Sequence, residues 1–303
     1  MSGTAALIAL RKRQDRWFAI LGLACTLVGV VTLGVLLSGL ISDGYQRLFD
    51  PTFYNSFPSR HAAKAGILSP LVGSLLLALI TIVLAVPLGV AAGVYLEEYA
   101  PRNWLTTIIE INIANLAGVP SIIFGLLALG LLIYGLGMPR STLVGGIALG
   151  LLVLPIVIVT TREALRAIPQ GIREAAYALG ATKWQVVQHH LLPYSMGGIA
   201  TGTIIAMSRA LGESAPLMTI GAVTFITFLP PAPVQSNPPF VNFEWLNSEF
   251  TAMPIQMFNW ISRPQAEFNS LAASAGIVLI ALTLSLNAAA IVLRYRLRQR
   301  IKW

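Results

Sequence analysis

The hydrophobic residues of this chain are gathered into long stretches that contain no charged residue. An α-helix needs about 20 apolar residues to cross the hydrocarbon core of a bilayer, and five uncharged stretches reach that length. A sixth stretch is long enough but contains Arg209 and Glu213. The pattern therefore predicts six transmembrane helices, at residues 17–42, 65–96, 111–139, 141–161, 195–225 and 269–293.

The positively charged residues are divided unevenly between the two sides that six crossings define. Both termini and the loops at 97–110 and 162–193 fall on one side and hold 14 of the 20 Lys and Arg residues, whereas the opposite side holds 5. Loops rich in Lys and Arg stay in the cytoplasm. The sequence therefore predicts that both termini are cytoplasmic.

The overall composition also favours a membrane protein. The chain has 303 residues, of which 56% are hydrophobic and 11% charged, and its mean hydropathy is +0.75. About 25% of the residues of soluble proteins are charged, so the composition excludes a soluble enzyme. The net charge of +8 would favour nucleic acid in a soluble chain, but here it reflects the predicted cytoplasmic loops, and no nucleic-acid partner is expected.

Few residues suit catalysis or metal binding. The single cysteine, Cys25, lies in an apolar stretch, so neither a disulfide framework nor a metal centre is predicted. No lysine follows a glycine, which a Walker A loop requires, so the chain has no nucleotide-binding motif of its own. We therefore expect no enzymatic activity and no cofactor bound by this chain.

The loop at 162–193 has a helical pattern that is interrupted at 168–171 and again at Gly180. Residues 173–177 predict one short helix, and Gly180 suits the left-handed conformation at its end. Thr182 can cap the next helix, and Pro193 begins the element that follows. The loop is therefore predicted to form a compact helix–turn–helix on the cytoplasmic face.

This loop resembles a signature of the permease subunits of type I ATP-binding-cassette (ABC) importers. The signature reads E-A-A-x-x-x-G and, after nine further residues, I-x-L-P. The matching positions are Glu174, Ala175, Ala176, Gly180, Leu192 and Pro193. His190 departs from the signature, which has an apolar residue there. The resemblance implies that the loop carries a coupling helix and docks on a separate ATPase dimer, which binds ATP and Mg²⁺; an ordinary amphipathic surface loop is the alternative.

Two charges lie inside the fifth predicted span. Each charge near the centre of a membrane helix costs about 2.5–3.5 kcal/mol to insert. Arg209 and Glu213 can pair, but an exposed pair at this spacing returns only about 0.2–0.5 kcal/mol. A polar cavity inside the bundle is the simplest explanation, and a packing ion pair between helices is the alternative.

The chemistry of this pair favours an anionic substrate. Arg presents a fork of donors that fits phosphate or carboxylate oxygens. Glu213 could hold Arg209 between substrates, or it could accept a proton from hydrogen phosphate. Asn115 and Ser121 are weaker candidates for the pathway, because their side chains could equally bond the backbone near Pro120.

Four further stretches resemble the phosphate permeases of the importer family, and specifically the A-type of the two related subunits. They are 95–100, 115–121, 209–217 and 253–260. The resemblance implies a role in phosphate passage for Arg209 and Glu213, a heterodimer with a second related permease, and a periplasmic or extracellular phosphate-binding protein. The alternatives are a permease for another anion, such as sulfate or molybdate, and an ion-coupled secondary transporter.

Two loops outside the spans have several interpretations. Glu97 and Glu98 are interpreted as part of a solvated loop, since acidic residues there require no site. The segment 229–267 is rich in proline and aromatic residues. By resemblance it receives the binding protein, and an aromatic belt at the membrane interface is the alternative.

The sequence thus predicts an all-α polytopic protein of the bacterial inner membrane, with six transmembrane helices and a cytoplasmic coupling helix. The predicted regions are a cytoplasmic tail at 1–16, a first transmembrane helix and outer loop at 17–65, an ABC importer transmembrane domain at 66–293 with its coupling loop at 162–193, and a basic cytoplasmic tail at 294–303.

Overall fold

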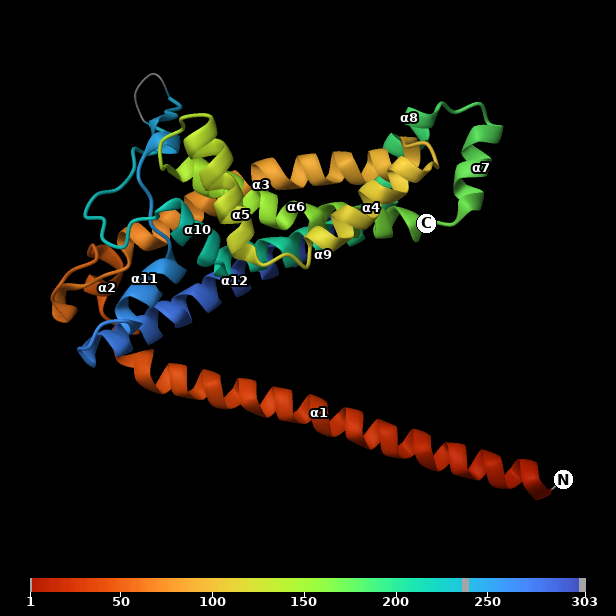
Figure 1. The fold of residues 1–303 in the computed structure, drawn as a ribbon, viewed down its shortest axis with the longest axis horizontal. Helices are drawn as coiled ribbons and strands as arrows, with labels where there is room; N and C mark the ends of the chain where they lie inside the picture. Colours follow the sequence, from red (N-terminus) through yellow and green to blue (C-terminus); the bar gives the residue numbers. More distant parts are fainter. Residues whose placement is uncertain (1, 236–239, 300–303) are drawn as a thin grey trace.

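The computed structural model describes residues 2–235 and 240–299, and the regular structure in these ranges is helical (Figure 1). The α-helices are α1 (Ser2–Leu48), α2 (Pro51–Asn55), α3 (Leu68–Val94), α4 (Trp104–Leu116), α5 (Ser121–Ala128), α6 (Thr142–Arg166), α7 (Gln170–Ala178), α8 (Lys183–Val186), α9 (Leu192–Gly212), α10 (Ala215–Ile220), α11 (Met253–Ile261) and α12 (Glu267–Gln299). The π-helical turns are η2 (Tyr95–Tyr99), η3 (Leu129–Gly135) and η4 (Val187–Leu191), and the 3₁₀ turns are η1 (Ala62–Lys64) and η5 (Glu244–Asn247). The predicted all-α fold is confirmed.

The centre of the bundle consists of α3, α6 and α9, which approach closely because small residues lie between them. A methyl group at Gly198 of α9 would lie 2.5 Å from Cβ of Ala164 on α6. A methyl group at Gly93 of α3 would lie 2.7 Å from Cβ of Thr161. Small residues let helices pack closely where no aqueous solvent drives their association.

Four helical stretches are long and apolar enough to cross a membrane, and they match the first, second, fourth and sixth predicted spans. They are Leu10–Leu48, Leu68–Tyr99, Thr142–Arg166 and Glu267–Arg296. α1 runs without a break through the predicted boundary at residue 17, and α12 runs through that at 293. Residues 300–303 of the predicted basic tail lie outside the described residues.

The third predicted span, 111–139, is interrupted at Pro120, and its two halves together are long and apolar enough to cross a membrane. α4 ends at Leu116, α5 begins at Ser121, and the axis bends by 108° between them. Pro120 lacks an N–H group and disfavours helical backbone in the residue before it, so the hydrogen bonds of α4 stop there. From α4 to η3 the chain still passes from the end of the bundle near α8 to the opposite end (Figure 1).

The fifth predicted span, 195–225, is also interrupted. α9 ends at Gly212, and Pro216 lies in the first turn of a new short helix, α10. α9 has 21 residues, which is about 31 Å at a rise of 1.5 Å per residue. Because it is not among the four apolar stretches, the count of six crossings stays a prediction.

Only the C-terminal end of α1 lies against the bundle, and the rest of the helix extends away from it toward the N-terminus (Figure 1). The hydroxyl of Ser274 on α12 donates to the carbonyl of Gly44 at 2.7 Å, whereas the apolar stretch of α1 is unburied. α1 begins and α12 ends toward the end of the bundle that carries α7 and α8 (Figure 1). This agrees with termini on one side, and the cytoplasmic assignment of that side stays a prediction.

Candidate functional site

Arg209 and Glu213 lie at the break between α9 and α10. Arg209 is in the last turn of α9, and Glu213 follows the helix with extended backbone. Nε of Arg209 donates to Oε1 of Glu213 at 3.4 Å, which is long for a charge-assisted hydrogen bond. The two side chains are 36% and 19% exposed. The pairing expected from the spacing is present, but it is loose.

The other contact of Arg209 is with the bend between α4 and α5. Its Nη1 donates to the carbonyl of Ala117 at 3.5 Å. Asn115 is exposed in the last turn of α4, and Ser121 is half-buried at the start of α5. The fold therefore brings the two interrupted spans together, with all four predicted pathway residues at or beside the breaks.

The second halves of the two interrupted spans are in direct contact. A methyl group at Gly125 of α5 would lie 2.6 Å from Cα of Pro216 and would collide with Oγ1 of Thr219. Since the absence of a side chain at Gly125 is what lets α5 lie against Pro216 and Thr219, the two helices pack closely here.

The loop between α6 and α9 forms the predicted helix–turn–helix. Gly180 has φ +83°, and the N–H of Ala181 donates to the carbonyl of Ala176 at 3.1 Å, which closes the end of α7. Thr182 caps α8, because its hydroxyl accepts from the N–H of Gln185 at 3.4 Å and its own N–H donates to Oε1 of Gln185 at 2.8 Å. The predicted roles of Gly180 and Thr182 in the local structure are confirmed.

The helix–turn–helix presents apolar side chains to solvent. Leu179 is 90% exposed, Trp184 58% and Tyr177 43%. Glu174 is exposed on the same helix, α7, whereas Ala176 is buried. These exposed apolar side chains make the helix–turn–helix a candidate interaction surface.

The remaining positions of the matched signature lie around this surface. Ala175 is exposed on α7, and Gly180 is exposed just after it. Leu192 and Pro193 are half-buried in the first turn of α9. The signature residues thus surround the turn and the start of the following helix.

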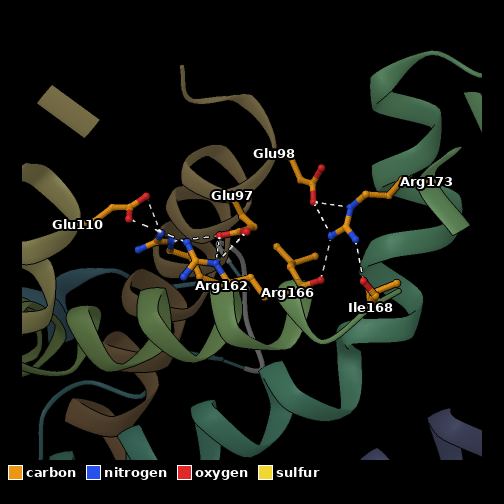
Figure 2. Close-up of polar contacts among 8 residues, drawn as sticks. Glu97, Glu98, Glu110, Arg162, Arg166, Ile168 and Arg173 are labelled. Atoms are coloured by element: carbon orange, nitrogen blue, oxygen red, sulfur yellow. Dashed lines mark hydrogen bonds and ion pairs between the residues drawn. The ribbon is translucent and has the colours of Figure 1, made fainter. Parts of the chain in front are cut away.

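Six charged side chains connect four elements at the same end of the bundle (Figure 2). This Arg–Glu cluster consists of Glu97, Glu98, Glu110, Arg162, Arg166 and Arg173. The side chains of Glu97 and Glu98 are only 15% and 8% exposed, so the interpretation as a solvated loop is wrong. η2 points Glu97 toward the arginines of α6 and Glu98 toward Arg173 of α7 (Figure 2).

Glu97 and Glu110 share the arginines at the end of α6. Nε of Arg166 donates to the two carboxylate oxygens of Glu97 at 2.9 and 2.8 Å. Arg162, with a side chain only 9% exposed, has Nε 3.5 Å from Oε2 of Glu97 and Nη2 2.5 Å from Oε1 of Glu110. These are ion-pair distances without hydrogen-bond geometry, because Nε and Nη2 of Arg162 are buried and have no hydrogen-bond partner among the described residues. The two carboxylates balance the charge of the guanidinium but do not satisfy all of its donors.

The sequence reasoning missed this cluster, although a signal was present. The chain contains only 12 acidic residues, and two of them, Glu97 and Glu98, are adjacent at the end of a span. Arg162, Arg166 and Arg173 fall on the same predicted side of the membrane. Scarce opposite charges gathered at one end of a bundle favour pairing.

The chain is similar to known transport proteins over most of its length. A family model described as "Binding-protein-dependent transport system inner membrane component" matches residues 85–303. The phosphate transport system permease protein PstA of Yersinia pestis is 34% identical over 281 residues, which are 90% of this chain and 87% of the relative. The protein of the same name from Haemophilus influenzae is 30% identical over 282 residues, covering 91% and 92% of the two chains.

A solved structure shows the same fold. The crystal structure of a bacterial alginate ABC transporter, in complex with an alginate pentasaccharide-bound periplasmic protein, has a chain that matches with a TM-score of 0.65 and 14% identity. The match covers 95% of this chain and 96% of that one. The family match and the identity to the curated relatives show that the chain belongs to the inner membrane components of binding-protein-dependent transport systems, which are multi-pass ABC permease subunits, and that the PstA proteins are its relatives in that family.

Proposed function

We propose that this chain is a permease subunit of an ATP-driven phosphate importer in the bacterial inner membrane, where it forms half of the translocation pathway together with a second, related permease. Family membership supports the ABC permease class. The names of the PstA relatives support phosphate as the substrate. The surroundings of Arg209 support a shared pathway.

The single observation that carries the proposal is the exposure of Arg209 where two helices are interrupted. Its side chain is 36% exposed on this subunit. Contact with lipid would cost about 2.5–3.5 kcal/mol for the charge, and the irregular backbone at 117–120 would expose peptide groups that lipid cannot satisfy. Another subunit and an aqueous pathway between the two would satisfy both.

Arg209 has the chemistry to bind an oxyanion in that pathway. Its guanidinium stays charged and presents paired N–H groups that match two phosphate oxygens. The contacts with Glu213 and Ala117, at 3.4 and 3.5 Å, are long, so an anion that forms shorter bonds can replace them. We assign Glu213 to holding Arg209 when no phosphate is bound, and Asn115 and Ser121 to further polar contacts along the pathway.

ATP hydrolysis is assigned to a separate ATPase dimer, which binds ATP and Mg²⁺ and docks on α7 and α8. The exposed Leu179, Trp184 and Tyr177 support this assignment, because a partner would remove them from water. Glu174 and the other signature residues lie on or around the same surface. In this arrangement α7, α8 and both termini are cytoplasmic, and the segment 229–267 faces a periplasmic phosphate-binding protein.

Purification of the tagged chain from membranes tests the assembly, and a second permease and an ATPase should co-purify. The complex is then placed in proteoliposomes with the binding protein, and import of radiolabelled phosphate and sulfate is measured with ATP and with a pH gradient alone. We expect phosphate import that requires ATP. Import of sulfate instead would assign another anion, and import driven by the pH gradient without nucleotide would overturn the proposal in favour of a secondary transporter.

A further inference from the structure

Arg173 connects α7 to two other elements through all three of its nitrogen atoms (Figure 2). Its Nη2 and Nε donate to Oε1 of Glu98 at 2.9 and 3.2 Å. Nη1 donates to the carbonyl of Ile168 at 2.8 Å, and Nη2 also donates to that of Leu165 at 2.9 Å. One side chain therefore holds α7 against the end of α6 and against η2.

The contact between Glu98 and Arg173 is shielded from solvent. Their side chains are 8% and 17% exposed. Exposed ion pairs contribute little, but removing one partner of a shielded pair leaves the other charge desolvated and unpaired. The next residue of α7, Glu174, is exposed instead. Neighbouring residues of α7 thus face the bundle and the surface on which the ATPase is proposed to dock.

Glu98 is also connected to the surroundings of Glu213 through a single helix. η2 continues α3 without an intervening loop. Toward its other end α3 contributes Ser74 and Ala78 to a void of about 10 Å³ that Glu213 also borders. A continuous helix therefore joins the helix–turn–helix to the proposed anion pathway.

We propose that the contact between Glu98 and Arg173 makes α7 and α3 move together, so that Glu98 is a positioning residue for the coupling of ATP hydrolysis to transport. This inference rests on the proposed function, because it requires an ATPase docked on α7 and α8. Movement of α7 displaces Glu98 and, with it, the helix that borders Glu213. An intermediate position alone does not demonstrate coupling, so the test measures coupling itself.

The central variant is Glu98→Gln, which keeps the size of the side chain and removes its charge. Phosphate imported and ATP hydrolysed are measured in the same proteoliposomes of the full complex. We expect co-purification of the ATPase to be unchanged and the phosphate imported per ATP to fall about tenfold, because Arg173 loses its charged partner. Glu98→Asp keeps the carboxylate and should restore part of the ratio.

Glu163→Gln is the matched control, since it removes the same charge from an exposed position near the same end of α6. It should leave the ratio unchanged. A merely structural role for Glu98 would reduce assembly and lower both rates together, with an unchanged ratio, and that result would overturn the inference.

A second variant decides the matter if Glu98→Gln does not assemble. Arg173→Lys keeps the positive charge, but one ammonium group cannot reproduce the planar set of contacts with Glu98, Leu165 and Ile168. Its ratio of phosphate to ATP should also fall, and an unchanged ratio would overturn the inference.

The two proposals fail in different ways. If the wild-type complex imports phosphate with ATP and these variants keep its ratio, the proposed function stands and the role of Glu98 is rejected. If the wild-type complex imports no phosphate, the proposed function itself is rejected.

Discussion

Two groups of opposite charges lie at different places along the bundle, and they are built differently. Arg209 and Glu213 come from one stretch of chain, and their atoms approach to 3.4 Å. The Arg–Glu cluster draws side chains from η2, α4, α6 and α7, and its contacts include distances of 2.8 and 2.9 Å. The proposed roles follow this difference: the first group would exchange one partner for an anion, and the second would hold neighbouring helices together.

The difference suits two tasks. A transport site has to release its ligand, so weak internal contacts around Arg209 are compatible with passage. A contact that connects two helices should keep the same partners throughout the transport cycle. Arg173 has three such partners, a carboxylate and two backbone carbonyls. The number and length of the contacts therefore separate a binding role from a positioning role, even though both groups use the same residue types.

The largest effect is expected from Arg209→Ala. Initial rates of radiolabelled phosphate uptake should fall about 100-fold or more, because a hydrogen bond to a charged group contributes about 1.5–3 kcal/mol and the guanidinium can supply two. Arg209→Lys keeps the charge without the fork and should give an intermediate rate. Co-purification of the partners serves as the control for assembly, and normal uptake by Arg209→Ala would remove Arg209 from the pathway.

The next largest effect should follow Glu174→Arg, which reverses an exposed charge on α7. We expect the amount of co-purified ATPase to fall about tenfold, because reversing the charge at residue 174 removes any favourable pairing that Glu174 makes with the partner. The thermal unfolding of the permease should not change. Unaltered co-purification would show that α7 is not the docking surface, and the comparison with Arg173→Lys would separate docking from coupling.

The sequence predicted the features that depend on residues close together in the chain or on the length of an apolar stretch. Gly180 and Thr182 end and begin helices through contacts within a few positions, and Arg209 meets Glu213 one turn away. The four long membrane helices follow from uninterrupted apolar stretches. These features needed no knowledge of the tertiary fold.

The breaks in the third and fifth spans could be predicted only in part, because the four prolines in or beside the spans indicate a kink or an interruption without saying which. Pro87 and Pro155 lie inside α3 and α6 without ending them, whereas Pro120 and Pro216 coincide with breaks. A proline therefore marks a weak point, and the surrounding packing decides whether the helix continues.

The Arg–Glu cluster was hidden for a different reason. Glu97 and Arg166 are 69 positions apart, and Glu98 and Arg173 are 75 apart. Pairing over such separations depends on how the helices assemble. The sequence shows that these charges share one predicted side of the membrane, but it does not show which of them pair. On the sequence alone, Glu97 and Glu98 are therefore interpreted as part of a solvated loop.

A smaller effect is expected from Gly125→Ala. This variant tests whether the loose contacts of Arg209 depend on close packing between α5 and α10. The added methyl group would press on Pro216 and Thr219, and overpacking of this kind costs about 1–3 kcal/mol. Thermal unfolding should shift downward and uptake should fall. Gly130→Ala is the control, since no atom lies within 4 Å of the added group. Equal behaviour of the two variants would contradict the contact between α5 and α10.

The smallest effect is expected from Arg166→Ala. This variant tests whether the contribution of each arginine of the Arg–Glu cluster to stability depends on how deeply its side chain is buried. The side chain of Arg166 is 55% exposed, so its pair with Glu97 should contribute no more than about 1 kcal/mol to stability. The side chain of Arg162 is 9% exposed, so Arg162→Ala should lower the stability more than Arg166→Ala, although Glu97 keeps its bond to Arg166. Thermal unfolding of the two variants measures the difference. Equal losses would mean that the cluster acts as one unit whatever the burial of each arginine, and the distinction between exchangeable and fixed charges would then have to rest on distance alone.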